Sequence, residues 1–255
     1  MIFDCFLYNG ERDILKLRCE EFKLMEPLKK FMPYKHVVIE SKFTFTGIEK
    51  KLTMTMGEID RYGIQWFPYN EKPTTDPWEN EKRTRNYIAE ALATLNPHPD
   101  DIVIISDVDE IPKTYALQHY RTAFGLTALQ MDVYHFYLNT IESTQTWRQA
   151  RIMPYIHLKD RSPEEVRRSG FNVALVNSGY HFTYMGGIDK VMAKFKSFAH
   201  QEEEIQRMAN REELEQKIAT CTSLWGDKVM KTVPITELPY YLQSHPEEFR
   251  HMLYV

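Results

Sequence analysis

The sequence predicts an α/β domain in which a mainly parallel central sheet is flanked by helices and followed by a helix-rich C-terminal part. Three observations predict this fold. Strand-like and helix-like segments alternate through the first half of the chain. Ile102–Ile105 is a continuous β-branched run between polar residues, which is typical of a parallel strand covered on both faces. Helical patterns dominate from Ile188 onward.

The first elements form a β-α-β unit. Ile2–Leu7 is predicted to be a short buried strand, Asp13–Met25 a helix and His36–Glu40 the second strand. Gly57–Trp66 is expected to be another strand region. These segments would place the carboxyl ends of two parallel strands side by side.

A helix and several strands are predicted after this unit. Asp76 and Pro77 have the pattern of an N-cap followed by proline at the first helical position, and the helix is expected to end near Leu95. Further strands are expected at Leu126–Leu138, Trp147–His157, Phe171–Val176 and Tyr180–Tyr184.

The totals favour one globular domain, residues 1–255, since single cores stop growing at roughly 250–300 residues. A formal charge of −4 makes nucleic acid a poor partner. The three cysteines form no C-x-x-C metal spacing and fit a reducing compartment. The N-terminus does not resemble a signal peptide, and no run approaches the roughly 20 apolar residues of a membrane helix. We therefore expect a cytoplasmic protein.

Asp107 and Asp109 follow the apolar run Ile102–Ile105 directly. If strand geometry persists, their side chains point the same way. Two carboxylates on one face favour a hard divalent ion such as Mg²⁺ or Mn²⁺, which commonly pairs protein carboxylates with substrate phosphates. The alternative is a polar strand end that caps a helix opened by Ile111 and Pro112, and the motif alone leaves both readings open.

Several sequence blocks together resemble glycosyltransferase family 17, a family of β-1,4-N-acetylglucosaminyltransferases. The blocks are Phe3–Glu11, Glu40–Gly47, Pro77–Glu81 with Arg85-Asn86, Ser106–Pro112, Gly179–Phe182, Phe195–His200 and Leu238-Pro239. The resemblance implies a GT-A type fold, a divalent ion, inversion at the anomeric carbon and UDP-N-acetylglucosamine as the donor. It further implies a nucleotide-sugar-binding half, residues 1–112, and an acceptor-side half, residues 113–255.

In such an enzyme the ion would bridge the donor's phosphates and offset the charge on the departing UDP. We expect Asp109 to bind the ion directly, and Asp107 to bind it through water or to hold the ribose. His181 is the candidate nitrogen ligand, with His200 as its competitor. A hydrogen-bonded structural histidine is the alternative for both.

The general base that removes the acceptor's proton is expected to be a carboxylate. Glu110, beside the metal pair, and Asp227, after Trp225-Gly226, are the two candidates, with Asp132 behind them. Glu110 could instead cap the following helix, and Asp227 could belong to a simple turn.

The nucleotide is expected to bind where the first two strands end. Asp4, Tyr8 and Asn9 belong to the end of the first strand, and Glu40 and Lys42 to the end of the second.

The helix that begins at Pro77 offers two more donor ligands. Arg85 could reach a phosphate, and Asn86 the ribose or a backbone group. A solvated helical face with ion pairs explains both residues equally well.

Two other functions are compatible with the same residues. An acidic strand end also suits a metal-dependent phosphoryl-transfer enzyme or phosphoester hydrolase, although the sequence has no P-loop. A non-catalytic carbohydrate-binding protein on the same fold is the third reading. We expect no membrane anchor, unless one was lost from a longer protein, so a microbial or viral enzyme with a glycan or other small hydroxyl acceptor is an equal alternative to one that modifies glycoproteins.

Overall fold

A computed structural model describes residues 1–24, 33–226 and 228–255. The chain opens with strand β1 (Ile2–Tyr8), helix α1 (Arg12–Lys23) and strand β2 (Tyr34–Ser41), and β1 and β2 pair in parallel. The predicted β-α-β unit is therefore confirmed. The expected end of its helix at Met25 lies outside the described residues.

The segment predicted as a strand at Gly57–Trp66 is mostly a helix, so this prediction was wrong. Helix α3 (Met56–Tyr62) begins with a capping box between Thr55 and Glu58 and ends at Gly63, whose φ of 62° suits glycine. Strand β3 (Gln65–Tyr69) follows and pairs with β2 in parallel. The capping signal outweighs the β-branched residues of this segment.

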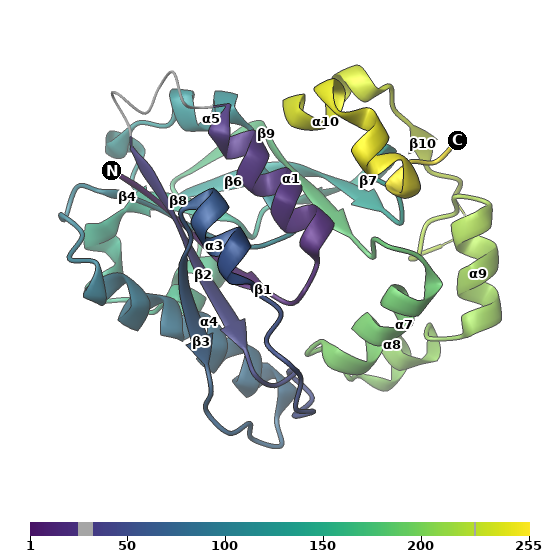
Figure 1. The fold of residues 1–255 in the computed structure, drawn as a ribbon, viewed down its shortest axis with the longest axis horizontal. Coiled ribbons are helices and arrows are strands. Elements are labelled where there is room, and N and C mark those ends of the chain that lie inside the picture. The colour runs from purple at the N-terminus through teal and green to yellow at the C-terminus, as the bar shows by residue number, and fades with distance from the viewer. Residues whose placement is uncertain (25–32, 227) are drawn as a thin grey trace.

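Helix α4 (Pro77–Thr94) has the predicted bounds, and Asp76 accepts a hydrogen bond from the backbone of Trp78. Its buried residues, Ile88 among them, pack against one face of the sheet, while α1 covers the other face (Figure 1). Strand β4 (Ile102–Asp107) lies beside β1 in parallel and is buried on both faces, as its composition predicts.

The residues after β4 form a strand, so the helix of the alternative reading does not begin at Ile111-Pro112. Strand β5 (Glu110–Pro112) pairs antiparallel with β9 (Val173–Thr183), and helix α5 (Thr114–His119) begins only afterwards. Strand geometry does not persist from Asp107 to Asp109 either, because β4 ends at Asp107 and a turn follows.

The second half of the chain extends the sheet with strands of both directions. Within the described residues the central path runs β10-β7-β6-β8-β4-β1-β2-β3, and β9 pairs with β6 and β5. The sheet is parallel from β4 to β3 and mixed beyond β4. The other strands are β6 (Thr127–His135), β7 (Thr140–Trp147), β8 (Arg151–Pro154) and β10 (Lys231–Thr232).

Two strand predictions in this half need correction. Trp147–His157 is not one strand, because it contains the end of β7, the whole of β8 and the 3₁₀ helix η2 (Tyr155–Leu158). Phe171–Val176 and Tyr180–Tyr184 are parts of the single long strand β9. Pairing with distant strands decides where these strands end, and local periodicity in the sequence does not predict those ends.

Helices complete the C-terminal part, as predicted. They are the helices α7 (Ile188–Ser197), α8 (Glu203–Arg207), α9 (Arg211–Ala219) and α10 (Tyr240–Ser244) and the 3₁₀ helices η3 (Ile235–Glu237) and η4 (Pro246–Met252). The shorter elements η1 (Thr122–Phe124) and α6 (Pro163–Arg168) lie between the strands. None of the described helices combines the length and apolar character required to cross a membrane.

The fold brings three strand ends together. In the register of the sheet Leu7 lies beside Asp107, and Tyr8 lies beside Glu40. The carboxyl ends of β1, β2 and β4 therefore meet at one edge, where ligands of open α/β sheets bind.

Candidate active site

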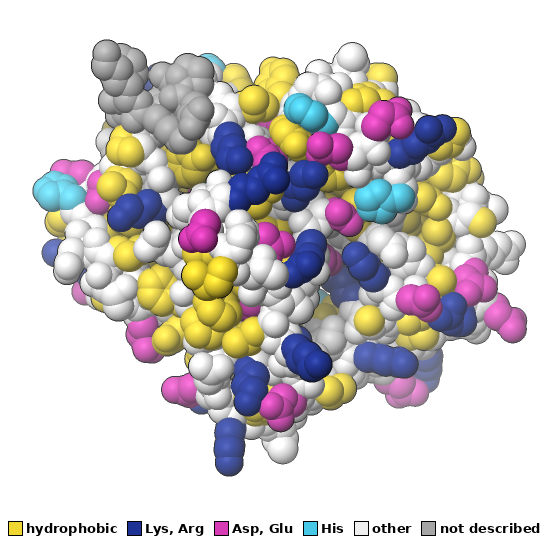
Figure 2. Space-filling view, viewed as in Figure 1, with side chains coloured by type: hydrophobic (Ala, Val, Ile, Leu, Met, Phe, Trp, Pro, Cys, Tyr) yellow, Lys and Arg dark blue, Asp and Glu magenta, His cyan; other side chains and the backbone are white. Residues whose placement is uncertain are grey.

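A cavity of about 540 Å³ opens at this edge of the sheet. Its lining includes the residues after β1, the end of β2, the turn after β4, parts of β6, β7 and β9, and helix α7. Figure 2 shows Lys and Arg side chains gathered around a hollow on this face of the molecule. A cavity with this lining suits an anionic ligand with further uncharged groups.

Asp107 lies in the cavity wall between two guanidinium groups. Arg85 Nη1 lies 3.2 Å from Asp107 Oδ1, and Arg167 Nη2 lies 2.7 Å from Oδ2. Arg85 is itself buried and also pairs with Glu81 and Glu164. Arg85 and Asp107 thus lie together at the cavity, and Arg85 also makes the intrahelical ion pair with Glu81 of the alternative reading.

Glu110 lies behind this wall and is fully buried. Both of its oxygens accept 2.7 Å hydrogen bonds from Arg167, and Oε1 also accepts one from Trp147 Nε1. Burial alone would raise the pKa of Glu110, but the charge and hydrogen bonds of Arg167 lower it to about 2. Glu110 therefore holds Arg167 and is not among the residues that line the cavity.

Arg18 holds the turn after β4 from inside the fold. Its Nη1 donates to the backbone carbonyls of Asp107, at 3.0 Å, and Glu110, at 2.7 Å. Asp4 accepts from Arg18 and lies 2.8 Å from Nδ1 of His36, and all three side chains are buried. Asp4 is therefore part of a buried network that supports the site, and does not line the expected nucleotide pocket.

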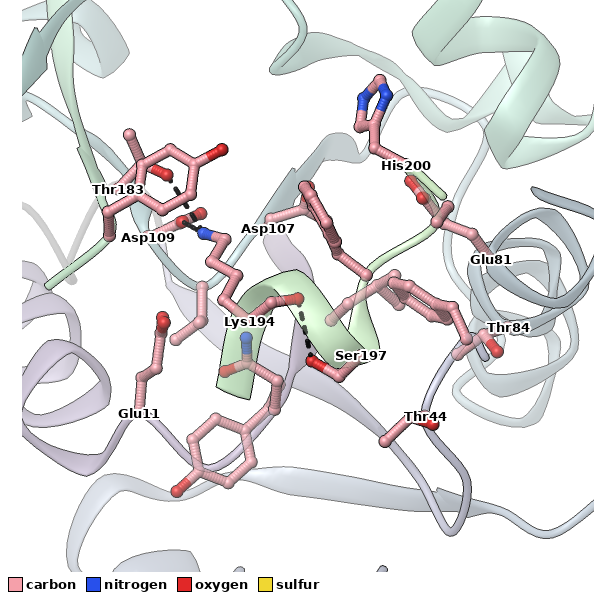
Figure 3. A pocket seen from close by; sticks show the side chains of 18 of the residues that line it. Glu11, Thr44, Glu81, Thr84, Asp107, Asp109, Thr183, Lys194, Ser197 and His200 are labelled. Carbon is pink, nitrogen blue, oxygen red and sulfur yellow. Dashed lines mark hydrogen bonds and ion pairs between the residues drawn. The ribbon is translucent and has the colours of Figure 1, made fainter. Parts of the chain in front are cut away.

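Asp109 lies on the other side of the turn and faces α7 and β9. Lys194 Nζ is 3.4 Å from Asp109 Oδ2 and 3.0 Å from Thr183 Oγ1. Figure 3 shows the Lys194 side chain directed toward both residues. His181 Nε2 is 3.8 Å from the same oxygen of Asp109. Burial lowers the pKa of His181 more than the nearby carboxylates raise it, so the imidazole is neutral and can act as a ligand.

Asp109 and His181 are the residues that would hold a divalent ion at this cavity. The described residues contain no group of three or more His, Cys, Asp or Glu side chains placed to hold an ion. Asp109 and His181 nevertheless present two ligand atoms of suitable chemistry to the cavity. Ions such as Mg²⁺ are commonly bound by one or two carboxylates plus substrate phosphates, so an ion here would take its remaining ligands from a substrate.

Some of the remaining predicted residues line the cavity, and others hold the surrounding segments in place. Tyr8 and Asn9 line the cavity. Glu40 is fully buried and accepts hydrogen bonds from Thr53 and Trp66, so it anchors the segment after β2 instead.

Of the four other candidates among the described residues, only His200 lines the cavity. Lys42 is half-exposed and pairs with Glu49 at 2.9 Å, and Asn86 accepts from the backbone of Glu164. His200 lines the cavity beside Trp78, whose ring centroid is 4.5 Å away. Asp132 is not among the lining residues, and Asp227 lies outside the described residues.

Buried polar atoms without a partner mark where a ligand fits. Among the described residues there are seven such side-chain atoms, and five belong to residues that line the cavity. Since buried polar groups are nearly always hydrogen-bonded, this concentration indicates that a polar ligand binds here. The five atoms are Tyr8 Oη, Glu11 Oε2, Lys50 Nζ, His135 Nδ1 and His181 Nδ1.

Sequence reasoning missed Glu11 and Lys50 as site residues. Glu11 precedes α1 and points into the cavity (Figure 3), and burial raises its pKa to about 7. Lys50 follows the turn after β2, and burial lowers its pKa. Glu11 was within a block that resembles the family, but Lys50 had no sequence signal that separated it from Lys51.

A crystal structure of S. aureus TarS residues 1–349 with UDP is 11% identical, with 86% of this chain and 72% of that chain covered and a TM-score of 0.40. A crystal structure of 4-diphosphocytidyl-2C-methyl-D-erythritol synthase is 14% identical, with 69% and 88% covered and a TM-score of 0.42. No curated protein sequence matches the chain. The sequence model of glycosyltransferase family 17 matches residues 1–238, and the chain therefore belongs to glycosyltransferase family 17.

Proposed function

We propose that this glycosyltransferase is metal-dependent and inverting, and that it transfers N-acetylglucosamine from UDP-N-acetylglucosamine to a hydroxyl group of a glycan or other small acceptor. One observation carries the proposal. A single cavity joins the Asp107–Asp109 turn to the unpartnered polar atoms of Tyr8, Glu11 and Lys50 at the strand ends. A nucleotide sugar needs polar groups for its nucleoside next to a charged region for its diphosphate, and this cavity offers both.

The nucleotide end of the donor would lie against Tyr8 and Asn9. Lys50 offers an ammonium group whose position in the cavity suits a uridine oxygen or a phosphate. Glu11 offers an acceptor oxygen for a hydroxyl of the donor. These contacts support the proposed donor because each one satisfies an atom that lacks a partner in the described protein.

The diphosphate would lie where the cationic side chains of Arg85, Arg167 and Lys194 meet the turn after β4. Asp109 and His181 would hold the divalent ion, and Asp107 would assist directly or through water. When bound, the ion acts as a Lewis acid that offsets the charge on the departing UDP. The cationic side chains supply further stabilisation of the same charge.

In an inverting transfer the acceptor oxygen forms a bond to the anomeric carbon as the bond to UDP breaks, and a base takes the hydroxyl proton. Glu110 is committed to Arg167 behind the wall. Asp227 stays our prediction for the base. Trp225, two residues before it, lines the cavity.

Calorimetric titration of UDP with and without Mn²⁺ tests the proposal, together with UDP release from UDP-N-acetylglucosamine. We expect tighter UDP binding with Mn²⁺, and slow release that is lost in Asp109→Asn. UDP-glucose and UDP-galactose should be turned over more slowly. Absence of Mn²⁺-dependent UDP binding in the wild type would sink the proposal, and binding without turnover for any acceptor would instead favour a carbohydrate-binding role.

A further inference from the structure

One wall of the cavity, formed by β6, β7 and the segment after β7, differs in chemistry from the rest. Gln145 and Trp147 lie two residues apart on β7, so their side chains share one face of the strand. Both line the cavity, and Gln149 continues the row beyond the strand end. Val133 and His135 of β6 line the cavity beside them.

This wall has no charge, whereas the rest of the cavity is rich in charge. Within the described residues, no Asp, Glu, Lys or Arg of β6, β7 or β9 lines the cavity. The charged lining residues belong to the β1–α1 connection, the segment after β2, α4, the turn after β4, α6 and α7. The lining therefore has a charged part, suited to a nucleotide diphosphate, and an uncharged part formed by β6, β7 and the segment after β7, which we call the uncharged half. The two parts meet at β9, where Lys194 of α7 lies 3.0 Å from Thr183 Oγ1.

The uncharged half is rich in unused hydrogen-bonding groups. The side-chain amides of Gln145 and Gln149 make no hydrogen bond with any described residue, and Nδ1 of His135 is buried without a partner. A side-chain amide both donates and accepts hydrogen bonds, and so does each hydroxyl group of a sugar, so the two can pair. A dry apolar ligand would leave these groups unsatisfied at a cost in binding free energy.

The uncharged wall also lies beside the proposed diphosphate and metal end of the cavity. The ring of Trp147 stacks on His181, with centroids 4.4 Å apart and an interplanar angle of 25°. His181 is in turn 3.8 Å from Asp109, at the proposed diphosphate and metal end. A ring bound beside Trp147 would therefore lie next to the donor's reacting carbon, on the side away from β1 and β2.

We infer that Gln145, Trp147 and Gln149 form the acceptor subsite and that this subsite binds an uncharged sugar ring. The inference rests on the proposed function and specifies its acceptor. A carboxylate or phosphate on the ring would be desolvated against a wall without a counter-charge, so anionic sugars are disfavoured. The two glutamines bind ring hydroxyls, and Trp147 supplies the apolar surface on which the ring lies.

Acceptor-dependent UDP release tests the inference, measured with UDP-N-acetylglucosamine and Mn²⁺. The neutral probes are the methyl glycosides of mannose, glucose, galactose and N-acetylglucosamine. Their anionic counterparts are mannose 6-phosphate and methyl glucuronide. We expect at least one neutral glycoside to accelerate UDP release at least tenfold more than either anionic sugar.

Variants then locate the subsite. Gln145→Ala and Gln149→Ala should each raise the KM for the effective glycoside about tenfold, the effect of one lost hydrogen-bonding group, with the Kd of UDP unchanged. Thr146→Ala is the matched control, because Thr146 lies between them on the opposite, exposed face of β7. It should change neither quantity.

The outcomes separate this inference from the proposed function. A wild-type protein that neither binds UDP nor releases it from the donor overturns both. If UDP binding and release are present, the inference alone is overturned by any of three results. These are a response only to anionic sugars, no response to any neutral glycoside, or an unchanged acceptor KM in both glutamine variants.

Discussion

Arg167 donates a 2.7 Å hydrogen bond to each carboxylate oxygen of Glu110, and this pair forms the buried support of the cavity wall. The same guanidinium reaches Asp107 at 2.7 Å. One buried cation therefore links a structural carboxylate, which no substrate reaches, to a carboxylate that faces the cavity. The charge of Glu110 consequently affects both the stability of the fold and the position of Asp107.

The Glu110 pair predicts a specific dependence of stability on pH. The pKa of Glu110 is about 2 in the folded protein and near 4.5 when unfolded, so its contribution is present above about pH 4.5 and is lost as the pH falls toward 2. We expect Glu110→Gln to reduce the free energy of unfolding by about 3 kcal/mol at pH 7. Urea unfolding at pH 7, 5 and 3 measures this, and an equal loss at every pH would contradict it.

Asp4 and Asn9, both expected from sequence at the nucleotide, are predicted to behave differently. Asp4→Asn leaves the buried Arg18 without its charged partner, so we expect the free energy of unfolding to fall by about 3 kcal/mol. Asn9→Ala should leave stability within about 0.5 kcal/mol and weaken UDP binding. Chemical denaturation and UDP titration of both variants measure the contrast, and similar stability losses would refute the assigned placement.

Lys50 and Lys42 form a matched pair for the nucleotide end. Lys50 Nζ is buried at the cavity without a partner, whereas Lys42 is paired with Glu49 near the surface. Because charge-assisted hydrogen bonds contribute about 1.5–3 kcal/mol, Lys50→Met should raise the Kd of UDP at least about tenfold. Lys42→Met should leave it within about twofold. Calorimetry decides, and a larger effect at Lys42 would reverse the assignment.

Lys194 is predicted to compete with the divalent ion. Its ammonium group is 3.4 Å from Asp109 and balances the charge of the carboxylate that a divalent ion would otherwise balance. Removing this charge in Lys194→Met should tighten Mn²⁺ binding about tenfold in the absence of UDP, and should weaken UDP binding. Lys196→Met, on the same helix but exposed and outside the cavity, is the control. Electron paramagnetic resonance of free Mn²⁺ measures the first effect, and unchanged affinity in Lys194→Met would count against it.

The sheet and helices of the first half were predictable because single segments decide them. Ile102–Ile105 is a short, continuous β-branched run, which favours a strand that is covered on both faces. Asp76 and Pro77 favour a helix start, because the Asp76 side chain accepts a backbone hydrogen bond and the φ of proline suits the first helical position. The error at Gly57–Trp66 came from overlooking an equally local signal, the Thr55 and Glu58 capping box. The breaks around β8 could not be predicted, since they depend on pairing with distant strands.

The site shows the same division between local and distant causes. Asp107, Asp109 and His181 were predicted as ligands from their residue types and strand positions, and all three line the cavity. The supporting roles of Asp4, Glu40 and Glu110 were missed, because each depends on a partner that only the fold supplies, such as Arg18 or Arg167. Strand-end position alone does not distinguish a carboxylate that faces a ligand from one that faces an arginine.

The cavity wall also has a consequence for protein synthesis. Arg18 can bind the carbonyl groups of the turn after β4 only once that turn has been synthesised. Asp109 likewise gains its contacts only after His181 and Lys194 have been synthesised. At a typical elongation rate of about 5–20 residues per second, β1 leaves the ribosome roughly 10 to 40 seconds before helix α7. Any N-terminal fragment that ends before Ile188 would lack a complete pocket. A ribosome-stalled series of increasing length should therefore gain UDP binding only after that helix has emerged.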